Sequence, residues 1–312
     1  MVGPYINTAI KIFIHIPGEK QTEKAMLCRG LREFVNLLVA PLEKVQERWN
    51  LPGFYEIRGN VSDMEWYRSD VSDMEWYQAT ETITDSHYSI VGEIVEAQPK
   101  SKLKLKASLC VEPWHPRKRI KTILLEVSKQ LWQKNSANID TILQHTTNAC
   151  FELGTTYSCI DSLPLGIFGN DIYTCGYRCF CREARYIDVE DKLSGVFWWQ
   201  LFSVRRIKES GEPTEILRQA EFLKTQFFPK EEMISIQLSK KVSDFAMEKR
   251  AAFRELFADS LYSFSLDEIR KMSMFFVNTI FFPLNDQEKN RLFESDSELK
   301  DLYDLIARRY KL

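Results

Sequence analysis

The stretch Lys102-Leu103-Lys104-Leu105-Lys106-Ala107-Ser108-Leu109-Cys110-Val111 places leucine, alanine and valine at every second position, with lysine, serine and cysteine between them. Successive side chains of a β-strand point to opposite faces of a sheet, so this pattern predicts a strand with one face in a core and a basic outer face. The stretch Ile10-Lys11-Ile12-Phe13-Ile14-His15-Ile16 has the same period of two. Both stretches therefore predict strands of a sheet with an apolar layer on one side.

Two stretches with apolar residues three or four positions apart predict helices that cover this sheet. The first spans residues 22–49, with a kink expected at Pro41, and the second runs from Pro116 to about Lys134. Further strands are expected at residues 54–58, 88–97, 172–180, 196–204 and 233–238, and a further helix at 213–228. This order predicts an α+β fold, mostly an antiparallel sheet with helices packed on one face.

The C-terminal part of the chain has helix-start signals, each a capping residue followed by an acid three positions later. They occur at Ser265, Asn285 and Ser295. We therefore expect two parts, an α+β domain over residues 1–238 with a duplicated loop at 61–80, and a helical subdomain over residues 239–312 packed on it.

Composition and charge exclude several classes of protein. The chain has 312 residues, of which 44% are hydrophobic and 28% charged, as expected for a folded globular protein. Its 42 basic and 44 acidic residues give a net charge of −2, so no global field drives it onto nucleic acid or an anionic membrane. No apolar run reaches membrane-spanning length, and Lys11, His15 and Glu19 interrupt the only candidate signal peptide. We expect a cytoplasmic protein that does not bind a membrane.

An exact duplication is the most distinctive feature of the sequence. The heptapeptide Val-Ser-Asp-Met-Glu-Trp-Tyr occupies residues 61–67 and again 71–77. An insertion of this kind is tolerated best in a surface loop, and acidic groups beside aromatic rings suit a protein interface. The predicted partner-binding residues are Asp63, Glu65, Trp66, Tyr67, Asp73, Glu75, Trp76 and Tyr77. The alternative is that one copy packs its Trp and Tyr on the sheet edge, while the other is a tolerated duplication without a role. The sequence does not say which copy is structural.

Five of the seven cysteines lie close together in the chain: Cys150, Cys159, Cys175, Cys179 and Cys181. One interpretation is a zinc site or a thiol-dependent enzyme that uses this region, since thiolates bind zinc and act as nucleophiles. The other is a set of buried structural thiols, because free cysteine is among the most buried residue types. Only Cys175 and Cys179 have a spacing typical of a zinc site. We therefore assign no cofactor, and zinc remains the alternative.

The known catalytic patterns are missing from the sequence. Neither the phosphate loop, the dinucleotide-binding glycines, the Gly-x-Ser-x-Gly turn nor the paired histidines of zinc proteases occurs. No catalytic residue is therefore assigned, and a binding protein is favoured over an enzyme.

A basic segment offers a third function. Residues 98–135 carry 10 basic and 2 acidic side chains, concentrated between Lys100 and Lys121. Such a segment can bind phosphates of nucleic acid, although a row of lysines on the outer face of a strand also prevents edge-to-edge pairing of sheets. We favour the second interpretation of residues 100–121.

The stretch Leu193-Ser194-Gly195-Val196-Phe197-Trp198-Trp199-Gln200-Leu201-Phe202-Ser203 resembles a segment of the bacterial type VI secretion immunity proteins and related polymorphic-toxin immunity proteins. The first strand and the helix after it are similar as well. The resemblance implies a cytosolic antidote that binds a cognate toxin and neutralises it by occlusion, without chemistry of its own. The acidic loop would then mimic an anionic substrate in a basic cleft of the toxin.

Overall fold

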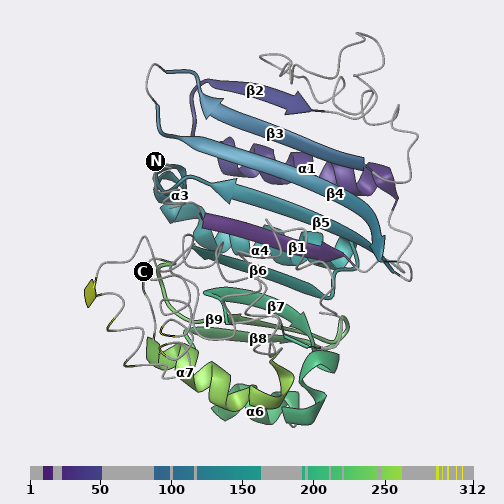
Figure 1. Ribbon diagram of the computed structural model, residues 1–312, viewed down its shortest axis with the longest axis vertical. Coiled ribbons are helices and arrows are strands. Elements are labelled where there is room, and N and C mark those ends of the chain that lie inside the picture. The colour runs from purple at the N-terminus through teal and green to yellow at the C-terminus, as the bar shows by residue number, and fades with distance from the viewer. Residues whose placement is uncertain are drawn as a thin grey trace. The chain divides into compact units, whose positions relative to one another are not determined.

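The computed structural model (Figure 1) describes residues 10–16, 23–50, 88–98, 101–115, 118–162, 192–193, 196–210, 212–219, 221–242, 244, 247–261, 286–287, 290, 294, 300 and 304. These residues fall into two compact units, one up to Ser158 and the other from Cys159 onward. We call them the N-terminal unit and the C-terminal unit. The boundary expected at residue 239 lies within the second of them.

Five antiparallel strands form the sheet of the N-terminal unit. They are β1 (Ile10–Ile16), β2 (Val45–Asn50), β3 (Tyr88–Glu96), β4 (Lys104–His115) and β5 (Lys118–Val127). The ladders place them in the order β2-β3-β4-β5-β1. Together with the helices below, this confirms the α+β fold with a mainly antiparallel sheet.

One face of this sheet is the core of the N-terminal unit. A row of directly paired residues crosses all five strands on this face: Trp49, Gly92, Ala107, Leu125 and Ile12. The small residues leave room for the Trp49 indole, since a Cβ atom added at Gly92 would lie 2.3 Å from that ring. Ile12 and Ala107 are buried, as the alternation in the sequence predicts, and Trp49 and Leu125 are buried as well.

Helices cover the same unit. They are α1 (Lys24–Val39), α3 (Lys129–Lys134) and α4 (Ile139–Glu152), with a short 3-10 turn η1 (Ser136–Asn138) before α4. Helix α1 runs behind β3 and β4 (Figure 1) and buries an apolar stripe that includes Leu27, Leu31 and Leu38. Strand β6 (Tyr157–Ser162) follows α4, and its Ser158 hydroxyl donates a hydrogen bond of 2.8 Å to the Phe13 carbonyl.

The predicted helix over residues 22–49 is wrong in its last third. Helix α1 ends at Val39, just before Pro41, and residues 45–50 form β2 instead. Proline lacks a backbone donor, so a helix seldom passes through it. Strand β2 is fixed by a buried charge: Glu47 Oε2 accepts from Arg32 Nη1 of α1 at 2.5 Å and from Trp49 Nε1 at 2.9 Å.

The predicted helix over residues 116–134 is also wrong, because residues 118–127 form β5 and only Lys129–Lys134 are α-helical. The apolar residues Ile123, Leu124 and Val127 fit a helical spacing as well as a strand with both faces covered. In β5, Ile123 and Val127 are fully buried on one face while Leu124, on the opposite face, is only 8% exposed. The strand forms because it pairs with β1 and β4 on both sides.

The C-terminal unit contains the antiparallel ladder β7-β9-β8, formed by β7 (Trp199–Ser203), β9 (Met233–Gln237) and β8 (Lys224–Phe228). The α-helices of this unit with described bounds are α6 (Pro213–Gln219) and α7 (Met247–Leu256), with 3-10 segments η4 (Val204–Ser210) and η5 (Ala258–Ser260). Helix α6 ends nine residues before the predicted Phe228, because β8 pairs with β9. The strands predicted near 196–204 and 233–238 are present, whereas the strand predicted at 172–180 and the starts at Ser265, Asn285 and Ser295 lie outside the described residues.

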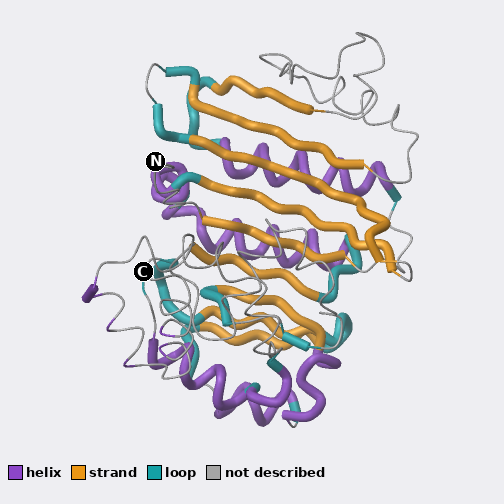
Figure 2. The backbone as a smooth tube through the Cα atoms, in the orientation of Figure 1, coloured by secondary structure: helices purple, strands orange, loops and turns teal. Residues whose placement is uncertain are grey.

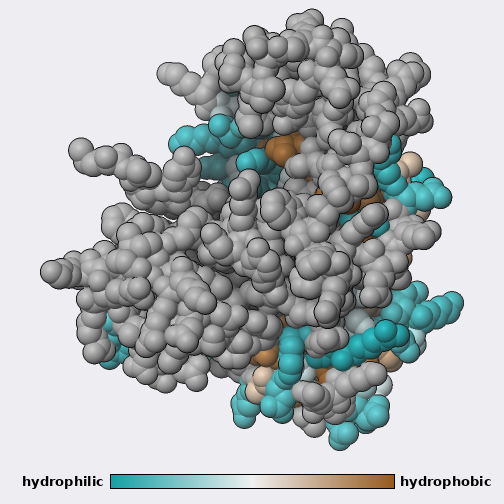
Figure 3. All heavy atoms as spheres, turned by 45° about the vertical axis from the view of Figure 1, so that its right-hand side comes forward, coloured by the Kyte–Doolittle hydropathy of each residue, from teal (hydrophilic) through white to brown (hydrophobic). Residues whose placement is uncertain are grey.

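An aromatic cluster packs α7 on the sheet of the C-terminal unit. The Phe202 ring of β7 meets the rings of Phe253 and Phe257 edge to face, with centroids 6.4 and 5.9 Å apart. Of the helices in the described ranges, none combines the length and the apolar character needed to cross a membrane. Figure 3 shows one face of the molecule, on which most of the coloured surface residues are hydrophilic.

Candidate functional site

The acidic and aromatic loop lies outside the described residues. This applies to all eight predicted partner-binding residues, Asp63, Glu65, Trp66, Tyr67, Asp73, Glu75, Trp76 and Tyr77. The cysteines Cys175, Cys179 and Cys181 also lie outside them. The predictions for these residues stay predictions.

Two cysteines of the predicted cluster are described, and both are buried. Burial raises the pKa of the Cys150 thiol from 9.0 to about 12, against a smaller lowering by hydrogen bonds with Ser158 and Thr155. Cys150 is therefore a protonated thiol at neutral pH, and only a thiolate is a good nucleophile or zinc ligand. Within the described ranges, no group of three or more His, Cys, Asp or Glu side chains could hold a metal ion.

The basic segment is divided by the structure into surface and core positions. Lys102, Lys104 and Lys106 are exposed on the outer face of β4 and its approach, as the alternation predicts. Lys121, in contrast, is only 8% exposed and lies opposite Val111 on the core side of the sheet. The predicted basic segment over residues 100–121 is therefore not one continuous basic surface, because Lys121 is buried.

Three connections meet at one end of the five-stranded sheet (Figure 2): the loop from α1 to β2, the turn from β3 to β4, and the junction of β5 with α3. Backbone hydrogen bonds join them. Ala97 N donates to Lys44 O at 2.9 Å, and Ser128 N donates to Lys104 O at 2.8 Å. In return, Lys104 N donates to Ser128 Oγ at 2.9 Å. This arrangement gathers five exposed lysines, which we call the lysine corner: Lys44, Lys102, Lys104, Lys129 and Lys134.

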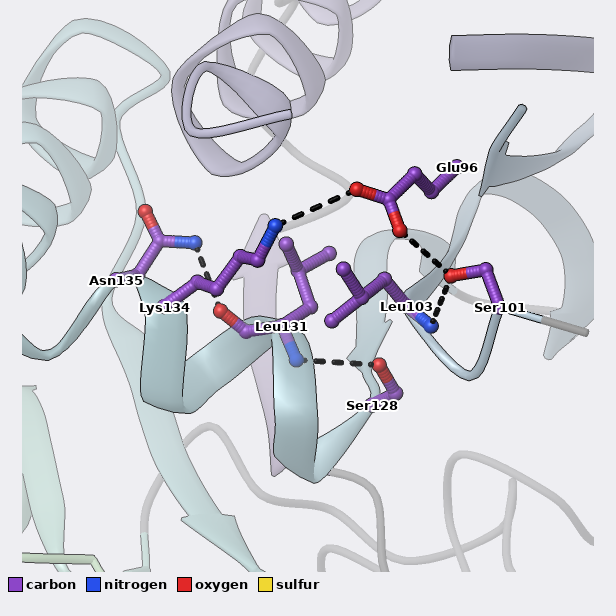
Figure 4. Close-up of polar contacts among 7 residues, drawn as sticks. All are labelled: Glu96, Ser101, Leu103, Ser128, Leu131, Lys134 and Asn135. Atoms are coloured by element: carbon purple, nitrogen blue, oxygen red, sulfur yellow. Dashed lines mark hydrogen bonds and ion pairs between the residues drawn. The ribbon is translucent and has the colours of Figure 1, made fainter. Parts of the chain in front are cut away.

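A buried carboxylate holds the lysine corner together (Figure 4). Glu96, at the end of β3, accepts from Ser101 Oγ at 2.8 Å and from Lys134 Nζ at 3.3 Å. Ser101 Oγ also accepts from Leu103 N at 3.1 Å, which fixes the turn between β3 and β4. Because the Glu96 side chain is only 8% exposed, this carboxylate is already committed to the turn and to α3.

Helix α3 is anchored at both of its ends. Ser128 caps its start, where Ser128 Oγ accepts from Leu131 N at 3.4 Å. At its other end the buried Asn135 side chain donates to Leu38 O, near the end of α1, at 2.9 Å, and to Leu131 O at 3.1 Å. Lys129 and Lys134 thus extend from a short helix whose backbone is fixed to the sheet and to α1.

The lysine corner ends where β4 continues along the sheet. In the register, Lys106 stands opposite Glu93 of β3 and opposite Glu126 of β5. Glu126 in turn faces Lys11 of β1, with 3.5 Å between Lys11 Nζ and Glu126 Oε2. Beyond Lys104 the outer face therefore alternates in charge from strand to strand.

Sequence reasoning found only part of the lysine corner. Lys102 and Lys104 belong to the predicted basic segment, and the high count of basic residues over 98–135 also includes Lys129 and Lys134. Lys44 lies far from that segment in the sequence and reaches it only because β2 pairs with β3. No local sequence signal could have indicated this.

The segment 193–203, which carries the family resemblance, has its described residues in the core of the C-terminal unit. Trp198 is fully buried; its backbone N–H donates to Asp161 Oδ2 at 2.9 Å, and its indole donates to Ser239 O at 2.8 Å. Asp161 also accepts from Arg250 Nη2 of α7 at 2.9 Å, and Arg250 Nη1 donates to Val196 O at 2.5 Å. The segment therefore has a structural role, joining β6, β7 and α7.

Comparisons with known proteins give a likeness of fold. No protein-family model matches the chain. The curated proteins contain no match either. Among the solved structures, a T6SS protein of Pseudomonas aeruginosa is similar to this chain with a TM-score of 0.55 and 10% sequence identity. The likeness covers 95% of this chain and 84% of the other chain, and it shows that the two share a fold.

Proposed function

We propose that this protein is an immunity factor, which binds a cognate bacterial toxin in the cytoplasm and neutralises it by occlusion. The observation that carries the proposal is the fold shared with a T6SS protein over 95% of the chain. The resemblance of residues 193–203 to immunity proteins points the same way and comes from sequence alone.

The chemistry of the described residues is compatible with a binding protein. Cys150, one candidate for a thiol-dependent enzyme, is held protonated by burial. The fixed backbone around Glu96 and Ser128 gives the surface lysines a preorganised frame, which lowers the entropy lost on binding. In the proposal, Trp66 and Trp76 anchor the toxin and the carboxylates beside them face its basic cleft.

The test is to express the product of the neighbouring open reading frame in a bacterial host, with and without this protein. We expect growth arrest by the neighbour alone, rescue by co-expression, and co-purification of the two products as a stable complex. Toxicity without rescue, or rescue without a complex, would contradict the proposal.

A variant set then tests the loop. Trp66→Ala, Trp76→Ala, Asp63→Asn and Asp73→Asn in one chain should abolish both rescue and co-purification. The matched control is Glu212→Gln with Glu215→Gln, which removes two exposed carboxylates at the start of α6. Rescue by the loop variant at the level of the control would remove the loop from the proposal.

A further inference from the structure

We propose that the lysine corner is a docking surface for an acidic segment of a protein partner. The corner lies apart in sequence from the loop at 61–77, and it could bind an acidic segment whether or not the partner is a toxin. Three properties of the corner suit it to this role: its charge is available, its frame is rigid, and its extent along β4 is limited.

The charge of the corner is available to a partner. Lys44, Lys102, Lys104 and Lys129 are exposed, and none of them forms an ion pair with another residue of the described part of the chain. The Glu96 carboxylate already accepts from Ser101 and Lys134, and Glu43, the residue before Lys44, is exposed. Within the described residues, Lys134 is thus the one member of the corner that has an ion-pair partner, and the charges of the other four lysines are available.

The frame that carries these lysines is rigid. Reciprocal hydrogen bonds between Lys104 and Ser128 fix the start of β4 beside the start of α3. The hydrogen bond from Ala97 N to Lys44 O fixes the start of β2 beside the end of β3. A positive surface on a fixed backbone needs only the lysine side chains to be ordered when a partner binds.

The extent of the corner favours a protein over a nucleic acid. A nucleic acid presents phosphates in a long row, and binding gains from each lysine or arginine along that row. Along the described part of β4, the row of lysines ends at Lys106, which stands opposite Glu93 and Glu126. The nearby Trp132 is only 4% exposed, so its ring is not available for stacking on a base. A compact group of lysines bounded by acids suits a short run of Asp or Glu on a protein.

The test measures binding of a fluorescent oligoglutamate peptide to the full chain by fluorescence anisotropy at low salt. We compare Lys102→Glu, Lys104→Glu and Lys129→Glu in one chain with a matched control, Lys230→Glu, Lys240→Glu and Lys241→Glu, which reverses three exposed lysines of the C-terminal unit. We expect the corner variant to bind about tenfold more weakly or worse, since several surface charge pairs are lost together. The control should bind within about twofold of the unchanged protein.

Two further measurements locate the bound peptide and test its chemical class. Lysine acetylation of the unchanged protein, with and without peptide, should show protection of the corner lysines and none at Lys230, Lys240 and Lys241, whether or not the variants fold. An oligothymidylate of equal charge is the second probe. Equal binding by both variants, absence of peptide binding or protection, or tighter binding of the oligothymidylate at the corner would overturn the proposal. No toxin is used here, so this result and the rescue assay can fail independently.

Discussion

The buried ion pair between Asp161 and Arg250 provides a sharp test of how the C-terminal unit is held together. Asp161 Oδ2 lies 2.9 Å from Arg250 Nη2, and the two side chains are 2% and 3% exposed. The same carboxylate oxygen accepts the Trp198 backbone N–H, also at 2.9 Å. The perturbation is Asp161→Asn, which keeps an oxygen acceptor for Trp198 but removes the negative charge beside Arg250.

The expected magnitude follows from this burial. Removing one partner of a buried pair leaves the other charge uncompensated, which costs about 3–5 kcal/mol of the free energy of unfolding. Arg250→Met should cost a similar amount, because it removes the guanidinium beside the buried carboxylate and the hydrogen bond to Val196 O. The double variant removes both charges, so its cost should be smaller than the sum of the two single costs by about 2 kcal/mol or more.

The assay is urea unfolding of all four proteins, combined with hydrogen exchange of peptides from β7 and α7 to locate the effect in the C-terminal unit. The matched control is Lys249→Met, on the residue before Arg250. Lys249 pairs with the Glu221 carboxylate at 3.9 Å, but the two side chains are 35% and 96% exposed. Because solvent screens such a pair, we expect a change of about 1 kcal/mol or less.

Additive costs of the two single substitutions would contradict this prediction. If the costs of Asp161→Asn and Arg250→Met add within about 0.5 kcal/mol, the two charges are not energetically coupled. A Lys249→Met cost equal to that of Arg250→Met would show that loss of a lysine or arginine stem, and not the buried charge, accounts for the result.

Two further predictions concern the N-terminal unit. Gly92→Ala should cost about 1–3 kcal/mol in urea unfolding, because the new Cβ would lie 2.3 Å from the Trp49 ring, and the same change made in a Trp49→Leu chain should cost clearly less; equal costs in the two backgrounds would contradict the contact. Burial raises the pKa of Cys150 from 9.0 to about 12, so above pH 9 the unfolded chain releases a proton that the folded chain keeps. Stability should then fall with rising pH by about 1.4 kcal/mol per unit more than in Cys150→Ala, and parallel pH curves of the two proteins would disprove this.

Strands with strict alternation could be predicted from the sequence, and some helices could not. Strands β1, β3 and β4 are close to their predicted ranges because a period of two is typical of a strand and does not fit the 3.6-residue turn of a helix. Helix α4 was missed because its buried face contains the β-branched polar residues Thr146 and Thr147. Their hydroxyls donate to Ile142 O at 2.7 Å and Leu143 O at 2.8 Å, which satisfies them inside the helix.

The charges of the candidate surfaces could also be predicted only in part from the sequence. A basic outer face on β4 could be predicted, since every second residue of a strand points to the same side. The role of Lys106 could not, because its carboxylate neighbours Glu93 and Glu126 come from adjacent strands. The predicted loop at 61–77 lies outside the described residues and stays a prediction.

The sequence by itself determined the class of fold, through local periodicity that decides which side chains face the core. The tertiary structure decided which charges are available at the surface. Strand register sets Lys106 between two acids, while the pairing of β2 with β3 and of β5 with β4 brings Lys44 and Lys129 to the end of the sheet beside Lys104. Electrostatic neighbours across strands depend on long-range hydrogen bonds, and no local pattern in the sequence encodes them.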